Sequence, residues 1–330
     1  MLFRSERGQC VRIMTGAPLP KGADTVVMQE DVEHDADRAR IGSGHKPGQH
    51  VRPAGEDVAA GHVVLKAGKR ILPSELGLLA SLGVAEVKVR RRLRVAFFST
   101  GDELRSIGEI LRNGEIYDSN RYTLYGMLAR LGVEIIDMGV VRDDRQATRN
   151  AFEQAAEDAD VIITSGGVSV GEADYVKETL DAIGQVDFWQ IAIKPGRPLA
   201  FGRVGAALFF GLPGNPVSVM VTFYQFVEPA LRRMMGQADA DAAPTFKVRC
   251  ATTLKKSRGR TEFQRAVLER DADGQLDFYG LQTLVCREMV EAGEVLVRLA
   301  ATGVCHTDAY TRSEEHTSEL QSPCNLVCRL

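Results

Sequence analysis

Acidic side chains recur in stretches of this sequence that are rich in glycine and hydroxyl residues. These acids are Asp102 and Glu103 in STGDEL, Asp143 and Asp144 after GVVR, and Glu172 and Asp174 in SGGVSVGEAD. Carboxylate oxygens suit Mg²⁺, which usually takes one or two of them together with the phosphates of a substrate. Each acid could instead cap the helix that follows it, as Asp143 and Asp174 are placed to do. Their recurrence in three separate loops favours a metal–phosphate site.

The glycine stretch TSGGVSVGEADY follows an apolar run, as a phosphate-binding loop does. Backbone N–H groups of Gly166, Gly167 and Ser169 can form a nest for an anion, helped by the N-terminus of the next helix. Glu172 and Asp174 would repel a bare phosphate. A hard cation between the carboxylates and the phosphate removes this conflict, so the stretch predicts an anion and a metal together.

Two further stretches, KPGRP and GLPGNPVS, carry cations and a helix start. The lysine and arginine of the first could bind a second anion. The second has an asparagine cap followed by proline at the first helical position. The candidate binding residues in these stretches are Lys194, Arg197, Pro213, Gly214 and Asn215.

Strand-like apolar runs lead into these loops, and they lie at 93–98, 133–138, 160–163 and 206–210. Between them, apolar residues recur at helical spacing, for example after Asp118, and Gly132 is a natural helix stop. Alternating strands and helices predict an α/β fold with a doubly wound, mostly parallel sheet. Ligands bind such sheets at the carboxyl ends of the strands, so we expect the loops to converge on one edge.

The flanking segments have a different character, with short apolar runs separated by Pro, Gly and Asp turns. A helix-like run is expected around Pro73 to Leu82, and the basic run Arg90–Arg92 reads as a solvated linker. The predicted division is an artefactual start (1–5), an incomplete β-rich N-terminal domain (6–55), a connecting β/helical segment (56–92), the α/β domain (93–243), an incomplete C-terminal β domain (244–282) and a chimeric tail (283–330).

Composition narrows the class of protein. The 330 residues are 44% hydrophobic and carry a formal net charge of -3, which favours neither a nucleic-acid nor a membrane-surface partner. No apolar run reaches the ~18 residues of a membrane helix, and the start has no signal-peptide pattern. The six cysteines show no zinc or disulfide spacing, so we expect a reduced, cytoplasmic setting. There is no Walker loop and no Ser-His-Asp order.

Taken together, the loops closely resemble the molybdopterin molybdenumtransferase family, which includes MoeA and the E domain of gephyrin. The matching blocks run in family order from about Arg12 to Gln282: RIMTGAPLP, GEDV, STGDEL, IYDSN, SGGVSVGEADY, KPGRP, GLPGNPVS and FQR. The resemblance implies a molybdopterin-binding α/β domain flanked by small β-rich domains. It also implies a homodimeric transferase of molybdenum cofactor biosynthesis.

The family's reaction takes adenylylated molybdopterin and molybdate, depends on Mg²⁺, and releases AMP as molybdenum is inserted. The resemblance implies that Glu103, Asp143 and Asp174 bind the metal and phosphate. It places Asp57 and Thr15 in the cleft, with Asp57 among the catalytic acids. Lys194 would belong to the molybdate site, and Arg265 of FQR would reach in from the β domain; other cofactor-biosynthesis enzymes are possible partners.

The sequence departs from the family at both ends. The acidic DNSAMDG-type motif has no counterpart, and Gln190 stands where the bacterial family often has a second lysine. Residues 292–311 resemble a zinc alcohol dehydrogenase fragment that includes Cys305. Residues 2–5 and 312–322 resemble the translation of sequencing adapters. We therefore expect the chain as it stands to insert molybdenum poorly.

Other functions remain open from the residues. A molybdopterin adenylyltransferase shares the SGG and PGNP loops, but segments 12–90 and 244–282 are not expected in it. A gephyrin-like binding scaffold would use the same fold to hold receptor tails. A zinc alcohol dehydrogenase is supported by about twenty residues and lacks the roughly three protein ligands that catalytic zinc needs.

Overall fold

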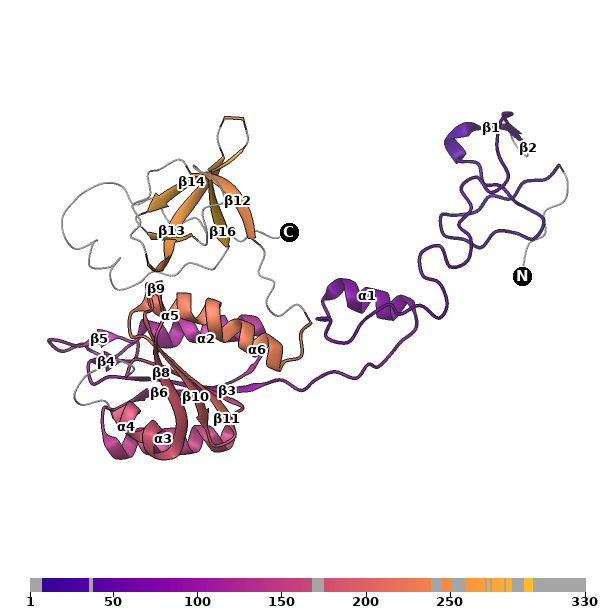
Figure 1. Cartoon of the computed structure of the whole chain (residues 1–330). Coiled ribbons are helices and arrows are strands. Elements are labelled where there is room, and N and C mark those ends of the chain that lie inside the picture. The colour runs from indigo at the N-terminus through magenta and orange to yellow at the C-terminus, as the bar shows by residue number, and fades with distance from the viewer. Residues whose placement is uncertain are drawn as a thin grey trace. The chain divides into compact units, whose positions relative to one another are not determined.

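The structure is a computed structural model in which two compact units are formed by Met1–Ala67 and Gly68–Leu330 (Figure 1). The division between the units falls inside segment 56–92, which the sequence analysis treats as one connection. The described residues are 8–35, 38–167, 175–238, 245–250, 259–270, 272–273, 275–281, 283–286 and 294–298.

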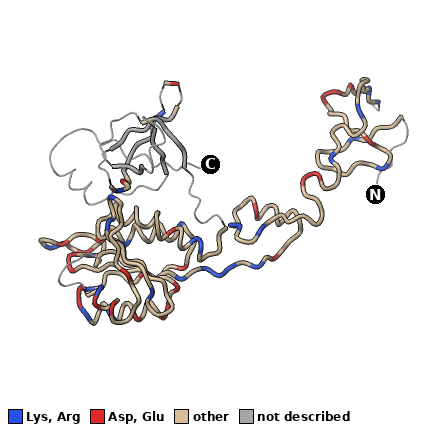
Figure 2. The backbone as a smooth tube through the Cα atoms, viewed as in Figure 1, with Lys and Arg blue, Asp and Glu red and all other residues tan. Residues whose placement is uncertain are grey.

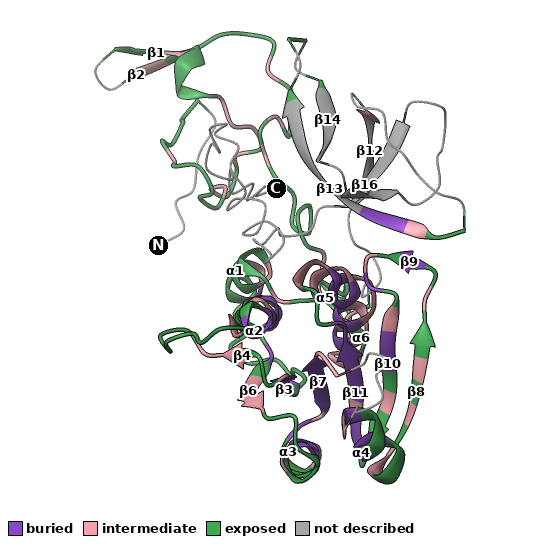
Figure 3. Ribbon diagram, turned by 90° about the vertical axis from the view of Figure 1, so that its left-hand side faces the viewer, coloured by how far each residue is buried: buried purple, intermediate pink, exposed green. Residues whose placement is uncertain are grey.

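The first unit contains little regular structure. A single turn of 3₁₀ helix, η1 (Gln29–Asp31), leads into an antiparallel hairpin of β1 (Val32–Asp35) and β2 (Arg38–Ile41). None of its described residues is buried, so Figure 3 shows no purple in this unit. The described part of the first unit therefore has no hydrophobic core of its own.

The second unit begins with helix α1 (Pro73–Ser81), which confirms the helix expected there and starts at a proline. The basic run that follows is exposed, as predicted, and is blue in Figure 2. Arg91 is nevertheless anchored, because both of its terminal nitrogens donate to the Asp160 carboxylate at 2.7 Å. Asp160 also accepts from the backbone N–H of Arg94, and its pKa falls to about 2, chiefly through the Arg91 hydrogen bonds.

A six-stranded sheet forms the centre of this unit, in the order β6-β3-β7-β11-β10-β8. The first four strands run parallel, and the last two are antiparallel to their neighbours. The strands are β3 (Arg94–Thr100), β6 (Glu134–Val141), β7 (Val161–Ser165), β8 (Gly184–Gln190), β10 (Pro198–Val204) and β11 (Ala207–Leu212). The predicted α/β fold with a mostly parallel sheet is confirmed.

Helices cover both faces of the sheet (Figure 1). One face carries α2 (Ser119–Leu131) and a helical run of α5 (Pro216–Thr222), the π-helical turn η2 (Phe223–Val227) and α6 (Glu228–Met234). The other carries α3 (Arg145–Asp158) and α4 (Tyr175–Ile183). Asp118 caps α2 by accepting from the N–H of Arg121, and Gly132 ends it with φ 76°, as the sequence predicts.

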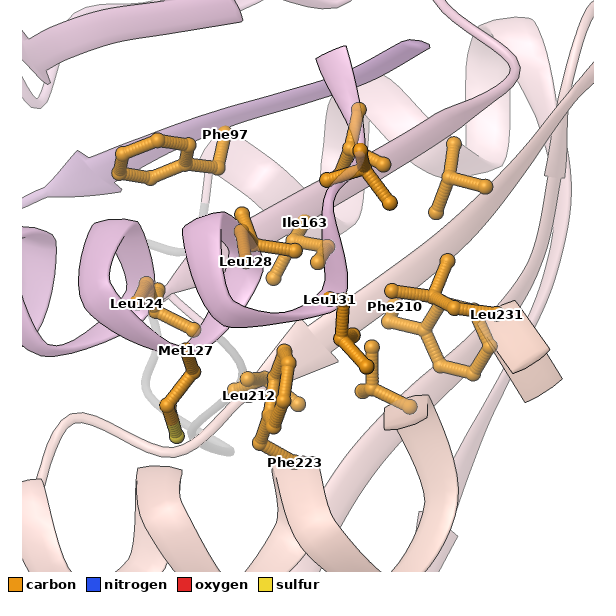
Figure 4. Close-up of a cluster of buried hydrophobic side chains, with 14 of the residues drawn as sticks. Phe97, Leu124, Met127, Leu128, Leu131, Ile163, Phe210, Leu212, Phe223 and Leu231 are labelled. Atoms are coloured by element: carbon orange, nitrogen blue, oxygen red, sulfur yellow. The ribbon is translucent and has the colours of Figure 1, made fainter. Parts of the chain in front are cut away.

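Alternation along the strands divides the core into two layers. On β3, Val95 and Phe97 face α2 and α5, whereas Ala96 and Phe98 face α3 and α4. Figure 4 shows the first layer, in which Phe97 and Ile163 lie beside α2 and Phe210 lies beside Leu231 of α6. Strands β3, β7 and β11 are buried almost throughout (Figure 3), so the edge of the sheet where they end is held rigidly.

A second sheet lies beyond residue 244. Its strand order is β15-β13-β14-β12-β16, and β9 (Ile193–Lys194) of the α/β domain also pairs with β13. The strands are β12 (Thr245–Cys250), β13 (Thr261–Arg270), β14 (Leu276–Leu281), β15 (Thr283–Cys286) and β16 (Glu294–Arg298). The sheet thus continues past Gln282, where the sequence analysis ends the β domain. Residues 299–330, including Cys305 and the stretch 312–322, lie outside the described residues.

Among the described residues, no helix has the length and apolar character to cross a membrane.

Candidate active site

The loops predicted to carry chemistry meet at one edge of the central sheet. Strands β6, β3, β7 and β11 are parallel, so their carboxyl ends lie together. Strand β10 is antiparallel to β11, with Ala200 opposite Gly211, so the connection from β8 to β10 lies at this edge as well. Strand order therefore fixes the order of the loops along the edge.

The acidic end of the edge lies at β6 and β3. The backbone N–H of Asp143, just after β6, donates to Oδ1 of Asp102, just after β3, at 3.2 Å. The pKa of Asp143 is raised, first by partial burial and then by the charges of Asp102 and Glu103. These acids therefore share one local field, in which a cation would be favoured.

Asp144, and not Asp143, caps helix α3. Its Oδ1 accepts from the backbone N–H groups of Gln146 and Ala147 at 2.8 and 3.0 Å. The alternative in which Asp143 serves as the helix cap is therefore wrong. Asp143 and Asp144 are neighbours of the same residue type with different surroundings.

The STGDEL loop holds Glu103 through a conformation that needs glycine. Gly101 has φ 147°, and a Cβ there would lie 2.6 Å from Oε2 of Glu103. The short strands β4 (Leu104–Arg105) and β5 (Ile116–Tyr117) close the loop, and the backbone oxygen of Glu103 accepts from the N–H of Ile116. The Glu103 carboxylate itself is exposed at the edge.

Two glycines at the centre of the edge allow close approach of the loops. Gly166 has φ 88°, and a Cβ there would lie 2.8 Å from the carbonyl oxygen of Thr100. Gly167 has φ 65°, and its Cβ would lie 2.5 Å from Cγ2 of Val176. Ser169, Glu172 and Asp174 lie outside the described residues, so the anion nest and the third acidic position stay predictions.

Asn120 is the last residue of the IYDSN block, where the sequence alone did not single it out. Its side chain joins two of these loops. Its Nδ2 donates to Oγ of Ser165 at the end of β7 (2.8 Å) and to the carbonyl oxygen of Gly214 after β11 (2.7 Å). A backbone carbonyl can only accept, so this contact fixes the orientation of the amide. The position of Asn120, two residues after the helix cap Asp118, is the signal that could have identified it.

Buried polar atoms gather around this junction. Within the described residues, those without a hydrogen-bond partner include Ser99 Oγ, Thr100 Oγ1, Asp118 Oδ2, Asn120 Oδ1 and Thr164 Oγ1. They lie at the last residues of β3 and β7 and at the start of α2. Each of these atoms is enclosed by the chain, so this polar set lies beneath the loops and not on the open surface of the edge.

The PGNP loop begins helix α5 in the way the sequence predicts. Oδ1 of Asn215 accepts from the backbone N–H groups of Val217 and Ser218 at 3.1 and 3.3 Å. Pro213 is buried and Gly214 is exposed. The loop lies beside the glycines that follow β7, because the backbone N–H of Gly166 donates to the carbonyl oxygen of Leu212 at the end of β11.

The basic end lies at the connection between β8 and β10. Nζ of Lys194 is 3.8 Å from Oε1 of Glu262, on strand β13 of the second sheet. Arg197 donates to Oε1 of Gln190 at 2.8 Å, and both basic side chains are exposed. A Cβ on Gly196 would lie 2.9 Å from Thr222, so this loop packs on α5.

Three other predicted site residues lie elsewhere or are only partly described. Thr15 and Asp57 belong to the first unit and are exposed, and Asp57 pairs with Arg52 at 2.9 Å. Arg265 lies on β13, where it pairs with Leu281. Glu103, Asp143, the two glycines and Lys194 all belong to the α/β domain.

Comparison with known proteins identifies the families to which these segments are similar. Residues 96–233 match the family described as "Probable molybdopterin binding domain", and residues 3–83 match the "MoeA N-terminal region (domain I and II)". A protein named molybdopterin molybdenumtransferase 2 from Mycobacterium tuberculosis is 41% identical over 82% of this chain and 67% of its own length.

The chain belongs to the molybdopterin molybdenumtransferase family. A second relative of that name, from Haemophilus influenzae, is 49% identical over 81% of this chain and 66% of its own length. A crystal structure of a molybdopterin biosynthesis protein from Pyrococcus horikoshii aligns with a TM-score of 0.62 at 32% identity, covering 84% of this chain and 68% of the other. The chain thus spans about two thirds of the length of each of these relatives.

Proposed function

We propose that this chain catalyses the insertion of molybdenum from molybdate into adenylylated molybdopterin, with release of AMP and dependence on Mg²⁺. The names of its relatives support the assignment to cofactor biosynthesis. The observation that carries the proposal is the order of charge along the edge. Acids lie after β6 and β3, glycines after β7 and β11, and cations in the connection from β8 to β10.

This order suits an extended substrate with a different chemical group at each end. Neighbouring strands lie about 4.8 Å apart, so the three steps from β3 to β10 separate the ends by ~14 Å. A nucleotide phosphate would bind at the acidic end through a metal. An oxyanion such as molybdate would bind at the basic end, through charge-assisted hydrogen bonds from Lys194 and Arg197.

The acidic residues fit Mg²⁺ better than a metal that demands a full protein cage. Among the described residues, no group of three or more His, Cys, Asp or Glu side chains could hold a metal ion. Mg²⁺ takes only one or two carboxylates together with phosphate oxygens and water. We assign Glu103 and Asp143 as its ligands, with Asp174 as the expected third. When bound, the ion would neutralise negative charge on the phosphates.

The rest of the edge would bind and orient the organic part of the substrate. The backbone groups of Gly167, which is partly exposed, and of Gly214, which is exposed, can form hydrogen bonds with a polar ring. Asn120 also holds the two central loops at a fixed separation. Such positioning contributes to catalysis because the reacting groups are already oriented when the substrate binds.

The remaining expectations of family membership belong to this proposal. They are a homodimeric, cytoplasmic enzyme in which Thr15, Asp57 and Arg265 complete the cleft. Other enzymes of cofactor biosynthesis are candidate partners. The choice of an enzyme over a binding scaffold is supported by the relatives named molybdopterin molybdenumtransferase.

The neighbouring pair Asp143 and Asp144 offers a matched test. The chain is incubated with adenylylated molybdopterin, molybdate and MgCl₂, and AMP is measured by chromatography. Asp143→Asn removes a charged metal ligand and should lower AMP release at least tenfold, or about 1.4 kcal/mol of barrier. Asp144→Asn should release AMP at the unmodified rate, because Asn caps a helix about as well as Asp.

The same loss is expected for Asp174→Asn. A stable Asp143→Asn protein that releases AMP at the unmodified rate would remove Asp143 from the site. A chain without Mg²⁺-dependent AMP release under any condition would refute the proposed activity for this chain.

A further inference from the structure

The basic end of the edge differs from the other loops because a second sheet reaches it. Strand β9 pairs in parallel with β13, which places Lys194 opposite Glu262. The backbone N–H of Thr261 donates to the carbonyl oxygen of Ala192 at 2.8 Å, which fixes this register. The position of Glu262 relative to Lys194 is therefore set by backbone hydrogen bonds and not by flexible side chains.

The two charged side chains have very different surroundings. Glu262 is 4% exposed, whereas the side chain of Lys194 is 52% exposed. A buried carboxylate is costly unless a cation or hydrogen-bond donors compensate it. The Lys194 ammonium, 3.8 Å away, contributes that compensation from the side of the solvent.

The distance between Nζ of Lys194 and Oε1 of Glu262 indicates how tightly the two side chains are joined. A direct N–H···O hydrogen bond is about 2.7–3.2 Å long, so 3.8 Å is an ion pair without a tight bond. The lysine side chain is long and has three donors on a rotatable ammonium. It can therefore turn from Glu262 toward an anion at the edge without movement of the backbone.

We infer that Glu262 is a positioning residue for the basic end: its carboxylate holds Lys194 when no oxyanion is bound and gives it up when one binds. The inference rests on the proposed function, since it takes the oxyanion at Lys194 to be molybdate. Glu262 makes oxyanion binding weaker than Lys194 alone would allow. In return, it keeps the ammonium at the place where the oxyanion enters.

Isothermal titration of the whole chain with sodium molybdate at low salt tests this inference. Glu262→Gln keeps the shape of the side chain but removes the competing charge. Molybdate should then bind about three- to tenfold more tightly, a modest factor because the lysine is half exposed and screened. Adding Lys194→Gln to this variant should abolish the gain, because the cation is then gone.

Two further variants control for folding and for charge. Glu228→Gln neutralises another buried acid, paired with Arg232 on α6, and should leave molybdate affinity unchanged. Glu262→Asp keeps the charge but withdraws it from Nζ by one methylene, so it should tighten binding less than Gln does. This variant tests the same direction if Glu262→Gln does not fold.

The outcomes separate this inference from the proposed function. Equal or weaker molybdate binding by folded Glu262→Gln and Glu262→Asp proteins that still release AMP would overturn the role of Glu262 alone. A chain that neither binds molybdate nor releases AMP would overturn both. Tighter binding that survives in the Lys194→Gln background would also overturn the inference, because the competition would then not act through Lys194.

Discussion

The acidic and basic ends of the sheet edge differ in whether their charged side chains already have a partner of opposite charge. At the acidic end, Asp102, Glu103 and Asp143 come from two adjacent loops of one domain, and the pKa of Asp143 is raised by partial burial and by the charges of Asp102 and Glu103. At the basic end, Lys194 already has a carboxylate beside it, supplied by the second sheet. The acidic end therefore favours an added cation, whereas an anion at the basic end must compete with Glu262. Under the proposed function, the edge binds a cation by attraction and an oxyanion by exchange with Glu262.

Removing the acidic end should have the largest effect. The double variant Glu103→Gln/Asp143→Asn loses two of the proposed metal ligands, and we expect AMP release to fall by at least about 100-fold, or ~2.7 kcal/mol of barrier. We expect higher MgCl₂ concentrations to restore part of the rate of AMP release in each single variant but not in the double variant, because each single variant keeps one of the two ligands. Rates that depend equally on Mg²⁺ in all of these proteins would contradict the assignment.

A substitution at the centre of the edge should lower the stability of the fold that holds both ends. Gly166→Ala places a Cβ 2.8 Å from a backbone oxygen at φ 88°, so we expect a loss of about 2–3 kcal/mol in the free energy of unfolding, measured with urea. Gly132→Ala is the matched control, because its φ is also positive but its Cβ would meet nothing within 4 Å. We expect about 1 kcal/mol there, and equal losses would show that the close approach to Thr100 is not tight.

Asp160 lies at the opposite edge of the sheet, and we expect its carboxylate to stabilise the fold without taking part in ligand binding. The pKa of Asp160 is about 2, below its ordinary value, so its contribution to stability is present above pH 4 and disappears as the pH falls toward 2. Asp160→Asn should cost about 1 kcal/mol at pH 7, discounted because Arg91 is exposed, and should flatten the pH dependence in this window. Thermal unfolding at pH 7 and pH 3 measures this. A change in molybdate or Mg²⁺ binding would contradict a purely structural role.

The smallest expected effect is a change in thermal stability when Asp143 at the acidic end is neutralised. The pKa of Asp143 is raised, so the folded chain holds this proton more tightly than the unfolded chain, and ionisation at neutral pH destabilises the fold. Without metal, Asp143→Asn should raise Tm at pH 7, by no more than about 2 °C because the side chain is exposed. The difference should vanish at low pH, where Asp143 is protonated. A lower Tm for the variant at pH 7 would mean that Asp143 stabilises the metal-free fold.

Much of the site followed from local patterns. The helix stop at Gly132 and the cap at Asn215 depend on residues close together in sequence. The antiparallel strands β8 and β10 were missed because short runs such as GQVDFWQ lie at the sheet margin and carry weak apolar patterns. The strand order, and with it the separation of acids from cations, depends on long-range pairing that periodicity does not encode. The Asn120 bridge and the Lys194–Glu262 pair join residues 45 or more positions apart, so they needed the fold to be visible.

The separation of the two ends is tested most directly by a crossed titration of the whole chain. Mg²⁺ with AMP, and separately molybdate, are titrated into Glu103→Gln and Lys194→Gln proteins that show unmodified unfolding curves. Glu103→Gln should lose at least about tenfold in affinity for Mg²⁺ with AMP, and Lys194→Gln should lose as much for molybdate. Each variant should keep the affinity for the other ligand within about twofold. Loss of both ligands by either variant would show that acids and cations serve one shared site.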